Sequence, residues 1–291
     1  MIGYPTGGPA DDLRDLIRVR ACADGTETVV WWTGDVYGWQ PDDGPRHLFG
    51  FEGVNVGRAR AVPGGYELLT REAAAYLDPR TREILQTWDN PLTGRSVEVM
   101  HVWNDPANQR WQEQGRFGPF RAPRVQIGDQ VVFNVDVLLA YPSPLPAAEF
   151  PDHSAGDIYR AMELFQFFAP AAELASEAGS VPCALSWTRV SPWLPWMELG
   201  ARPGALVYHC RGAKLGGWDE VPDRLREHVA AQAPAFAHAP RSGRSPTRPA
   251  GPPSGSGLPA ITDRILGFWV YMSAFGKERS SGPLTGKTPD G

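Results

Sequence analysis

The chain has 291 residues, a net charge of −5 and 42% apolar residues, an ordinary share for a globular protein. This length can bury the core of one large domain or two small ones. Acidic and basic residues are mixed along the whole chain, so there is no basic stripe that could neutralise phosphates. Nucleic acid is therefore not an expected partner.

The cysteine content and the ends of the chain bear on its location. Cys22, Cys183 and Cys210 share no metal-ligand spacing and cannot all pair, which is typical of a reducing cytoplasm. The first residues contain neither an apolar stretch nor a twin-arginine pair. The apolar run 265–275 is well short of the roughly 20 residues that cross a bilayer. We expect a cytoplasmic protein with no membrane span.

The first element in chain order is a short helix over 10–20, in which Leu13, Leu16 and Ile17 share one face. From 26 to 168 the pattern changes to short runs of Val, Tyr, Phe, Trp and Thr separated by turn residues, which predicts antiparallel strands. The fold class that we predict is mainly β: an antiparallel barrel-like sheet, similar to calycins and lipocalins, with a few peripheral helices.

Several segments make this prediction specific. Strands over 84–88 and 97–103 flank the loop 90–94, which ends in a glycine able to take positive φ, and so predict a hairpin. In the second of these strands both faces carry polar and apolar residues, as in barrel strands that border a filled interior. A further strand is predicted over 131–139. The run 158–175 fits either helix or strand, and strand is favoured.

Toward the end of the chain, Pro222–Ala231 predicts a helix that packs outside the sheet. We predict a single β-rich domain over 1–240. Residues 241–260 are rich in Pro, Gly and Ser and predict a disordered linker. Residues 261–291 comprise an apolar segment, which either returns to the main body or binds a partner, and a flexible tail. The oligomeric state is left open.

A tryptophan-rich segment over 186–215 follows the predicted sheet strands. Pro192 and Pro195 exclude a regular helix here and predict a stiff loop that leaves a strand. Its aromatic side chains would expose a large apolar area in water, so they either plug the core or line a pocket. We expect a pocket for an apolar small molecule. The expected substrate-binding residues are Trp103, Asn104, Trp187, Arg189, Trp193, Trp196, Met197 and Tyr208.

The candidate acid–base residues are His101, His209, Asp105 and Glu198. An imidazole titrates near neutral pH, so His101 could transfer a proton while Asp105 orients it. Alternatively, His101 is a core residue and Asp105 caps a turn. His209 either joins His101 and Glu198 around one pocket or faces solvent.

The sequence gives little support for a metal or a cofactor. Two histidines with a carboxylate could bind a metal, but no local spacing supports such a site. The chain has no dinucleotide-binding glycine motif, nucleophile elbow, zinc-protease motif or Cys-x-x-Cys. Neither metal nor cofactor is therefore expected.

Four stretches, 88–94, 101–106, 186–197 and 203–214, resemble DUF1838, a bacterial and fungal family of unknown function. The resemblance implies a predominantly β fold and brings no established activity or catalytic residues. Members commonly carry an export signal and lack a linker after the position of Pro240, and this chain differs in both respects.

The expected function is that of a cofactor-independent enzyme, a cyclase or isomerase of specialised metabolism acting on a hydrophobic small molecule. Such chemistry needs an apolar cavity that holds the substrate in a reactive geometry, together with one or two acid–base groups. One alternative is a hydrolase of an ester or epoxide. Another is a carrier that binds an aromatic or lipid-like ligand without catalysis. An enzyme should place a titratable group with a shifted pKa in its pocket, whereas a carrier should show an apolar pocket.

Overall fold

The computed structural model describes residues 2–3, 8–105, 108–115 and 118–241. Nearly all of the predicted linker and the whole of 261–291 lie outside the described residues. The described part is mainly β, as predicted, and its main sheet contains 11 strands that pair antiparallel. In order across the sheet these are β1 (Ile2–Gly3), β11 (Arg124–Ile127), β12 (Gln130–Pro142), β13 (Ile158–Pro170), β14 (Ala184–Ser191), β15 (Ala205–Leu215), β2 (Thr28–Trp39), β3 (Arg46–Val62), β4 (Gly65–Leu77) and β7 (Val102–Asn104), with β8 (Gln109–Gln112) also paired to β4.

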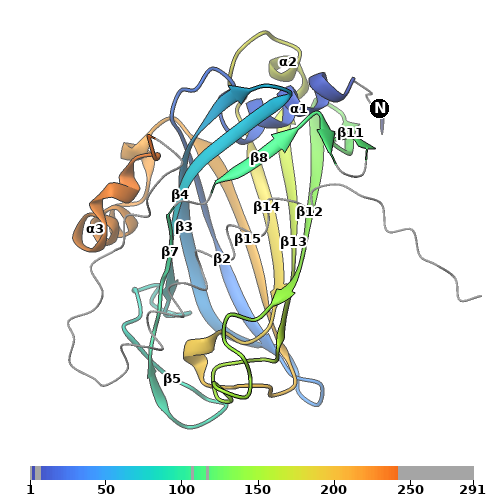
Figure 1. Ribbon diagram of the computed structural model, residues 1–291. Coiled ribbons are helices and arrows are strands. Elements are labelled where there is room, and N and C mark those ends of the chain that lie inside the picture. The colour runs from blue at the N-terminus through green and yellow to red at the C-terminus, as the bar shows by residue number, and fades with distance from the viewer. Residues whose placement is uncertain (1, 4–7, 106–107, 116–117, 242–291) are drawn as a thin grey trace, which may run out of the picture.

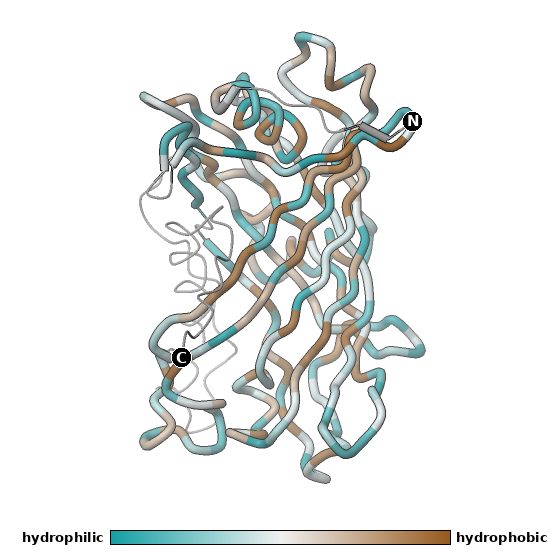
Figure 2. Tube along the Cα trace, turned by 90° about the vertical axis from the view of Figure 1, so that its right-hand side faces the viewer, coloured by the Kyte–Doolittle hydropathy of each residue, from teal (hydrophilic) through white to brown (hydrophobic). Residues whose placement is uncertain are grey.

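The long strands curve around a common interior, with α1 (Pro9–Arg20) at one end and α3 (Asp223–Gln232) on the outside (Figure 1). Hydrophobic and hydrophilic positions interchange along these strands (Figure 2), because successive side chains point to opposite faces of a sheet. Within the described residues no strand pairing joins the two outer edges of the sheet. The antiparallel β prediction is confirmed, while closure into a calycin-like barrel stays a prediction.

The predicted hairpin is present but shorter. β5 (Thr87–Asp89) pairs with β6 (Ser96–Glu98) in a small separate sheet, and Gly94 in their loop has φ of +72°. The single strand predicted over 97–103 is wrong, because the chain leaves the hairpin after Glu98 and pairs again only as β7, against β4. A second small sheet joins β9 (Gln114–Gly115) to β10 (Gly118–Pro119).

Several predicted elements are confirmed. The segment 131–139 lies within β12. The ambiguous segment 158–175 is the strand β13 followed by the one-turn helix α2 (Ala171–Leu174). The helix α3 packs Leu225 and Val229 on the outer face of β2, β3 and β4, as its pattern predicted.

Two apolar clusters lie inside the curve of the sheet, one at each end. At the α1 end, Leu13, Leu16 and Ile17 pack with aromatic residues from β8, β12 and β13. At the opposite end, the 3₁₀ turn η1 (Pro195–Met197) packs with residues from β2, β3 and β4. The other 3₁₀ turns, η2 (Trp218–Glu220) and η3 (Pro234–Ala237), flank α3. The two clusters lie toward opposite ends of the sheet, and the middle of the sheet lies between them.

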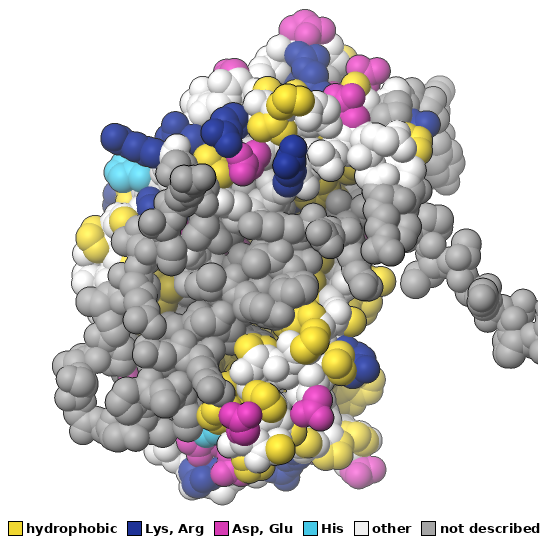
Figure 3. Space-filling model, viewed as in Figure 1, with side chains coloured by type: hydrophobic (Ala, Val, Ile, Leu, Met, Phe, Trp, Pro, Cys, Tyr) yellow, Lys and Arg dark blue, Asp and Glu magenta, His cyan; other side chains and the backbone are white. Residues whose placement is uncertain are grey.

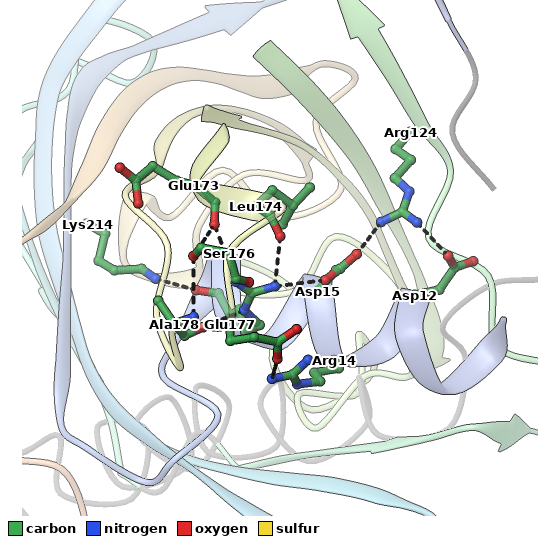
Figure 4. A network of polar contacts seen from close by, with 11 residues as sticks. Asp12, Arg14, Asp15, Arg124, Glu173, Leu174, Ser176, Glu177, Ala178 and Lys214 are labelled. Carbon is green, nitrogen blue, oxygen red and sulfur yellow. Dashed lines mark hydrogen bonds and ion pairs between the residues drawn. The ribbon is translucent and has the colours of Figure 1, made fainter. Parts of the chain in front are cut away.

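The buried guanidinium of Arg18 fastens α1 to the rest of the molecule. It donates to the backbone carbonyls of Ala178 (2.6 Å) and Leu174 (3.0 Å) and to the Asp15 carboxylate (3.2 Å). From β15, Lys214 Nζ donates to the Arg18 carbonyl at 2.6 Å, and Figure 4 shows Lys214, Asp15 and the 173–178 segment gathered there. The position of α1 over the end of the sheet is thus determined by hydrogen bonds as well as apolar packing.

The described surface is mixed in charge, and Figure 3 shows hydrophobic side chains along the side formed by β12 and neighbouring loops. Leu138 on β12 is exposed, as are Ile158 and Met162 on the neighbouring strand β13. No described helix has both the length and the apolar composition needed to cross a membrane. The three cysteines are buried as free thiols.

Candidate functional site

A cavity of about 210 Å³ lies inside the curved sheet, between the two apolar clusters. Its walls come from β2, β3, β4, β7, β8, β12, β13, β14 and β15, and from the end of α1. The polar or charged residues that line it include Arg20, Asn55, Thr70, Glu72, Tyr76, Asn104, Gln109, Glu163, Arg189 and Tyr208. The cavity wall thus combines apolar residues with several acidic, basic and phenolic groups.

Glu72 lies on the wall formed by β4. Because side chains alternate along a strand, it shares the inner face with Ala74 and Tyr76. In the sheet register it lies between Asn55 on β3 and Asn104 on β7, and Asn104 Nδ2 donates to Glu72 Oε1 at 3.2 Å. Burial, together with repulsion from Glu163, raises the pKa of Glu72 to about 7. At neutral pH this carboxyl group is therefore present in both protonation states.

A second acidic group, Glu163, is held by an ion pair. Glu163 on β13 lies directly opposite Arg189 on β14 and pairs with its guanidinium. Arg189 Nη2 also donates to the Tyr159 hydroxyl at 2.7 Å. The two ionised groups are only 10% (Arg189) and 17% (Glu163) exposed, so each needs the other to offset the loss of hydration.

A pair of tyrosines forms part of the same cavity wall. The hydroxyl groups of Tyr76, on β4, and Tyr208, on β15, lie 3.0 Å apart, and both side chains are buried. In register, Tyr208 lies directly opposite Arg189. Burial raises the pKa of Tyr208, although the positive charge of Arg189 opposes this shift, so the phenol stays protonated at neutral pH.

Aromatic rings form much of the remaining wall. The Trp187 ring meets those of Trp32, Phe51 and Phe165 at centroid distances of 6.0–6.2 Å. Trp32 fits because its cross-strand neighbour is Gly53: a Cβ at that position would collide with the Trp32 indole. The middle of the cavity is therefore lined by rings.

Arg20, the last residue of α1, lines the cavity at the end nearest this helix. Its guanidinium carbon lies 5.4 Å from the centre of the Trp111 ring and 5.7 Å from that of Phe167, and Nη1 donates to Gln109 Oε1 at 3.0 Å. Burial lowers the pKa of Arg20 to about 10, so the group remains a cation at neutral pH. A cation thus stands at the α1 end and an ion pair farther inside.

The structure brings together half of the predicted substrate-binding residues. Asn104, Trp187, Arg189 and Tyr208 line the cavity. Trp193, Trp196 and Met197 are instead buried in the apolar cluster that closes the far end. Trp103 lies on the outer face, where its ring contacts Phe236 and His228.

The four predicted acid–base residues do not line the cavity and do not meet one another. His101 is half-buried beside His228, and its Nδ1 accepts from the Tyr76 backbone N–H at 3.3 Å. Asp105 pairs with Arg71 Nε at 3.0 Å, and Glu198 pairs with Arg95 at 3.2 Å. His209 is exposed, which is the alternative that the sequence left open. In these positions each of the four contacts other residues or solvent. Their catalytic roles stay predictions.

Among the described residues no group of three or more His, Cys, Asp or Glu side chains is arranged to hold a metal ion. His101, His209 and Glu198, the set considered from the sequence, are separated by the sheet: His209 is exposed on the outer face, whereas Glu198 belongs to the turn after η1.

The position of His101 predicts acid sensitivity of the fold. Burial, with a smaller contribution from His228, lowers the pKa of His101 to about 3, whereas an unfolded histidine titrates near 6.5. Below pH 6.5 the unfolded chain binds a proton that the folded chain does not, so stability should fall by at most about 1.4 kcal/mol per pH unit down to pH 3. Urea unfolding at pH 7 and pH 5 should show a smaller loss for His101→Asn, whose amide oxygen can still accept from Tyr76. Equal losses in both proteins would contradict this assignment.

The residues that sequence reasoning missed are Glu72, Tyr76 and Glu163. The sequence did contain a signal for Glu72. It alternates with Ala74 and Tyr76 on one face of a strand, which places an acidic residue among inward-facing positions. What the sequence could not supply is the pairing that sets Glu72 and Glu163, from strands on different parts of the sheet, around one cavity.

Comparison with known proteins gives a family without a function. Among curated proteins none matches this chain significantly. The family model described as "Protein of unknown function (DUF1838)" matches residues 25–248, which include the strands that form the cavity. The resemblance noted in the sequence is thereby confirmed, and the chain belongs to the DUF1838 family.

Proposed function

We propose that this protein is a cofactor-independent isomerase or cyclase that moves a proton on a hydrophobic small molecule held in the cavity. The observation that carries this proposal is the Glu72 carboxyl group, which lines a ring-walled cavity and accepts a hydrogen bond from Asn104. A carrier would need only the apolar wall. A carboxyl group placed inside it costs desolvation energy, and such costs are commonly borne at catalytic sites.

The protonation state of Glu72 supports this role. A group that both removes and returns a proton is most efficient when its pKa lies near the working pH. The pKa of Glu72, raised to about 7 by burial and by Glu163, meets that condition. Asn104 fixes the orientation of the carboxyl group, which leaves its other oxygen for substrate.

The walls support a hydrophobic substrate of limited size. An apolar cavity of about 150 Å³ can hold benzene, so a cavity of about 210 Å³ suits a compound of one or two rings. Aromatic faces also attract positive charge, including the charge of a cationic cyclisation intermediate. We propose that the curved sheet serves as a cup for a single ligand, as calycin-like barrels do.

Solvent isotope incorporation tests the proposal. The protein would be incubated in D₂O with a pool of one- and two-ring apolar compounds, and products would be followed by mass spectrometry. The expected result is protein-dependent uptake of deuterium, or formation of an isomer, in one class of compound. Native mass spectrometry would identify which compounds bind. Compounds that bind but neither exchange nor rearrange would contradict the proposal and favour the carrier.

A further inference from the structure

The Tyr76–Tyr208 pair has one hydroxyl hydrogen more than the pair itself uses. Two hydroxyl groups 3.0 Å apart share a single hydrogen bond, in which one donates and the other accepts. Among the described residues neither hydroxyl has another hydrogen-bond partner. The accepting hydroxyl therefore keeps a hydrogen that is free to bond to something else.

Both tyrosines line the cavity, and either hydroxyl can donate to the other. When Tyr76 donates, Tyr208 accepts, and the Tyr208 hydroxyl hydrogen is left for a group in the cavity. A buried donor without an acceptor is costly, so a ligand that accepts this hydrogen is favoured.

The surroundings of Tyr208 favour an oxygen that becomes negative. Arg189 lies directly opposite Tyr208 on the neighbouring strand, and Glu163 and Tyr159 hold its guanidinium in place. A hydroxyl group that accepts one hydrogen bond also becomes a better donor, because consecutive hydrogen bonds polarise one another. Donors fixed before the reaction, close to a positive charge, are the usual means of stabilising an oxyanion.

We infer that Tyr208 donates a hydrogen bond to a carbonyl oxygen of the substrate, which is therefore a hydrophobic ketone or aldehyde of one or two rings. This inference rests on the proposed function, in which Glu72 moves the proton. The Glu72 carboxylate takes a proton from a carbon next to the carbonyl, or conjugated with it. The C–H electron pair forms a new C=C bond, and the C=O π pair moves to oxygen.

The resulting oxyanion accepts the Tyr208 hydrogen bond, and Tyr208 keeps its proton. Where a neighbouring C=C bond extends the enolate, return of the proton from Glu72 to the far carbon of that bond restores the carbonyl group, shifts the C=C bond and completes an isomerisation. No oxidant, reductant or other reactant is consumed.

A matched pair of ligands tests the inference without turnover. 1-Tetralone carries a carbonyl group, and 1-methylidenetetralin replaces its oxygen with CH₂ at nearly the same shape. The wild-type protein should bind the ketone more tightly than the hydrocarbon. The infrared C=O stretch of the bound ketone should lie at lower frequency than that of a ketone without a hydrogen bond. In Tyr208→Phe, ketone affinity should fall about tenfold, the worth of one hydrogen bond, and the shift should disappear. Hydrocarbon affinity should stay unchanged.

Tyr37→Phe is the control, because Tyr37 lies on β2 outside the cavity. It should leave both affinities and the carbonyl frequency unchanged. The double variant Tyr76→Phe/Tyr208→Phe leaves no unpaired hydroxyl and replaces the single variant if that one fails to fold. The inference is overturned if the ketone binds no better than the hydrocarbon, or if the carbonyl frequency is the same with and without Tyr208. A retained frequency shift without deuterium uptake would leave Tyr208 as the donor and reject the proton transfer.

Discussion

Replacing Glu72 with glutamine is expected to lower the rate of proton transfer by about 10²–10⁴-fold, the usual contribution of a general acid or base. Glutamine has nearly the same shape, and its carbonyl oxygen can accept the hydrogen bond from Asn104 that Glu72 accepts at 3.2 Å. It cannot take up a proton. Deuterium uptake by the substrate class identified in D₂O measures the effect, and the wild-type rate should change with an inflection near pH 7, where Glu72 titrates.

The matched control for this variant is Glu67→Gln. Glu67 lies on the same strand, β4, but does not line the cavity and pairs with Arg60 at the surface. Its replacement should leave the rate and the inflection unchanged, because exposed ion pairs contribute little. Glu72→Gln should unfold at no lower urea concentration than wild type at pH 8, since it removes the cost of a buried charge. A variant that retains the full rate would exclude Glu72 as the proton-transfer group.

Replacing Arg18 with methionine is expected to destabilise the fold by about 3–5 kcal/mol, the range for breaking a buried charged network. The Arg18 side chain is 2% exposed. Methionine can fill much of the space, but it cannot donate to the carbonyls of Ala178 and Leu174, and it leaves these acceptors buried without their partner. Equilibrium urea unfolding gives the free energy directly.

Arg14→Met provides the comparison on the same helix. Arg14 is 43% exposed and pairs with Glu177, which is 89% exposed, so its loss should cost less than about 1 kcal/mol. A similar loss in both variants would mean that helix propensity or net charge causes the effect, and would contradict a fastening role for Arg18. Because Arg20 ends the same helix and lines the cavity, Arg18→Met should also weaken binding of the ligand.

Much of the fold could be predicted from local pattern. The helix over 10–20, the strand around 131–139 and the outer helix near 222–231 each follow from a pattern contained in a short segment. The segment 158–175 fitted helix or strand, and the favoured strand is present as β13. The prediction of one strand over 97–103 was wrong because pairing with a strand distant in the sequence competes with the hairpin. The end of this segment pairs with β4 and does not extend the hairpin. Alternation alone does not show where a strand changes partners.

The candidate site could be predicted only in part. The tryptophan-rich segment led to Trp187 and Arg189, on the strand that enters its loop, and to Tyr208, on the strand that leaves it. It also suggested Trp193 and Trp196, whose rings are required by the core instead. Histidines were chosen for their titration near neutral pH, yet the proposed acid–base group is a carboxyl group, Glu72, whose pKa is shifted by burial. Such a shift depends on surroundings that only the folded chain assembles.

The most direct test of the account is a titration of the Glu72 carboxyl group by NMR, with ¹³C-labelled glutamate and assignment by the Glu72→Gln variant. We expect the signal lost in the variant to titrate with a midpoint near pH 7, because burial and the charge of Glu163 oppose ionisation of Glu72. A midpoint near 4.5, the value for an unperturbed glutamate, would mean that Glu72 is hydrated and permanently ionised at neutral pH. That result would contradict the proposed acid–base site.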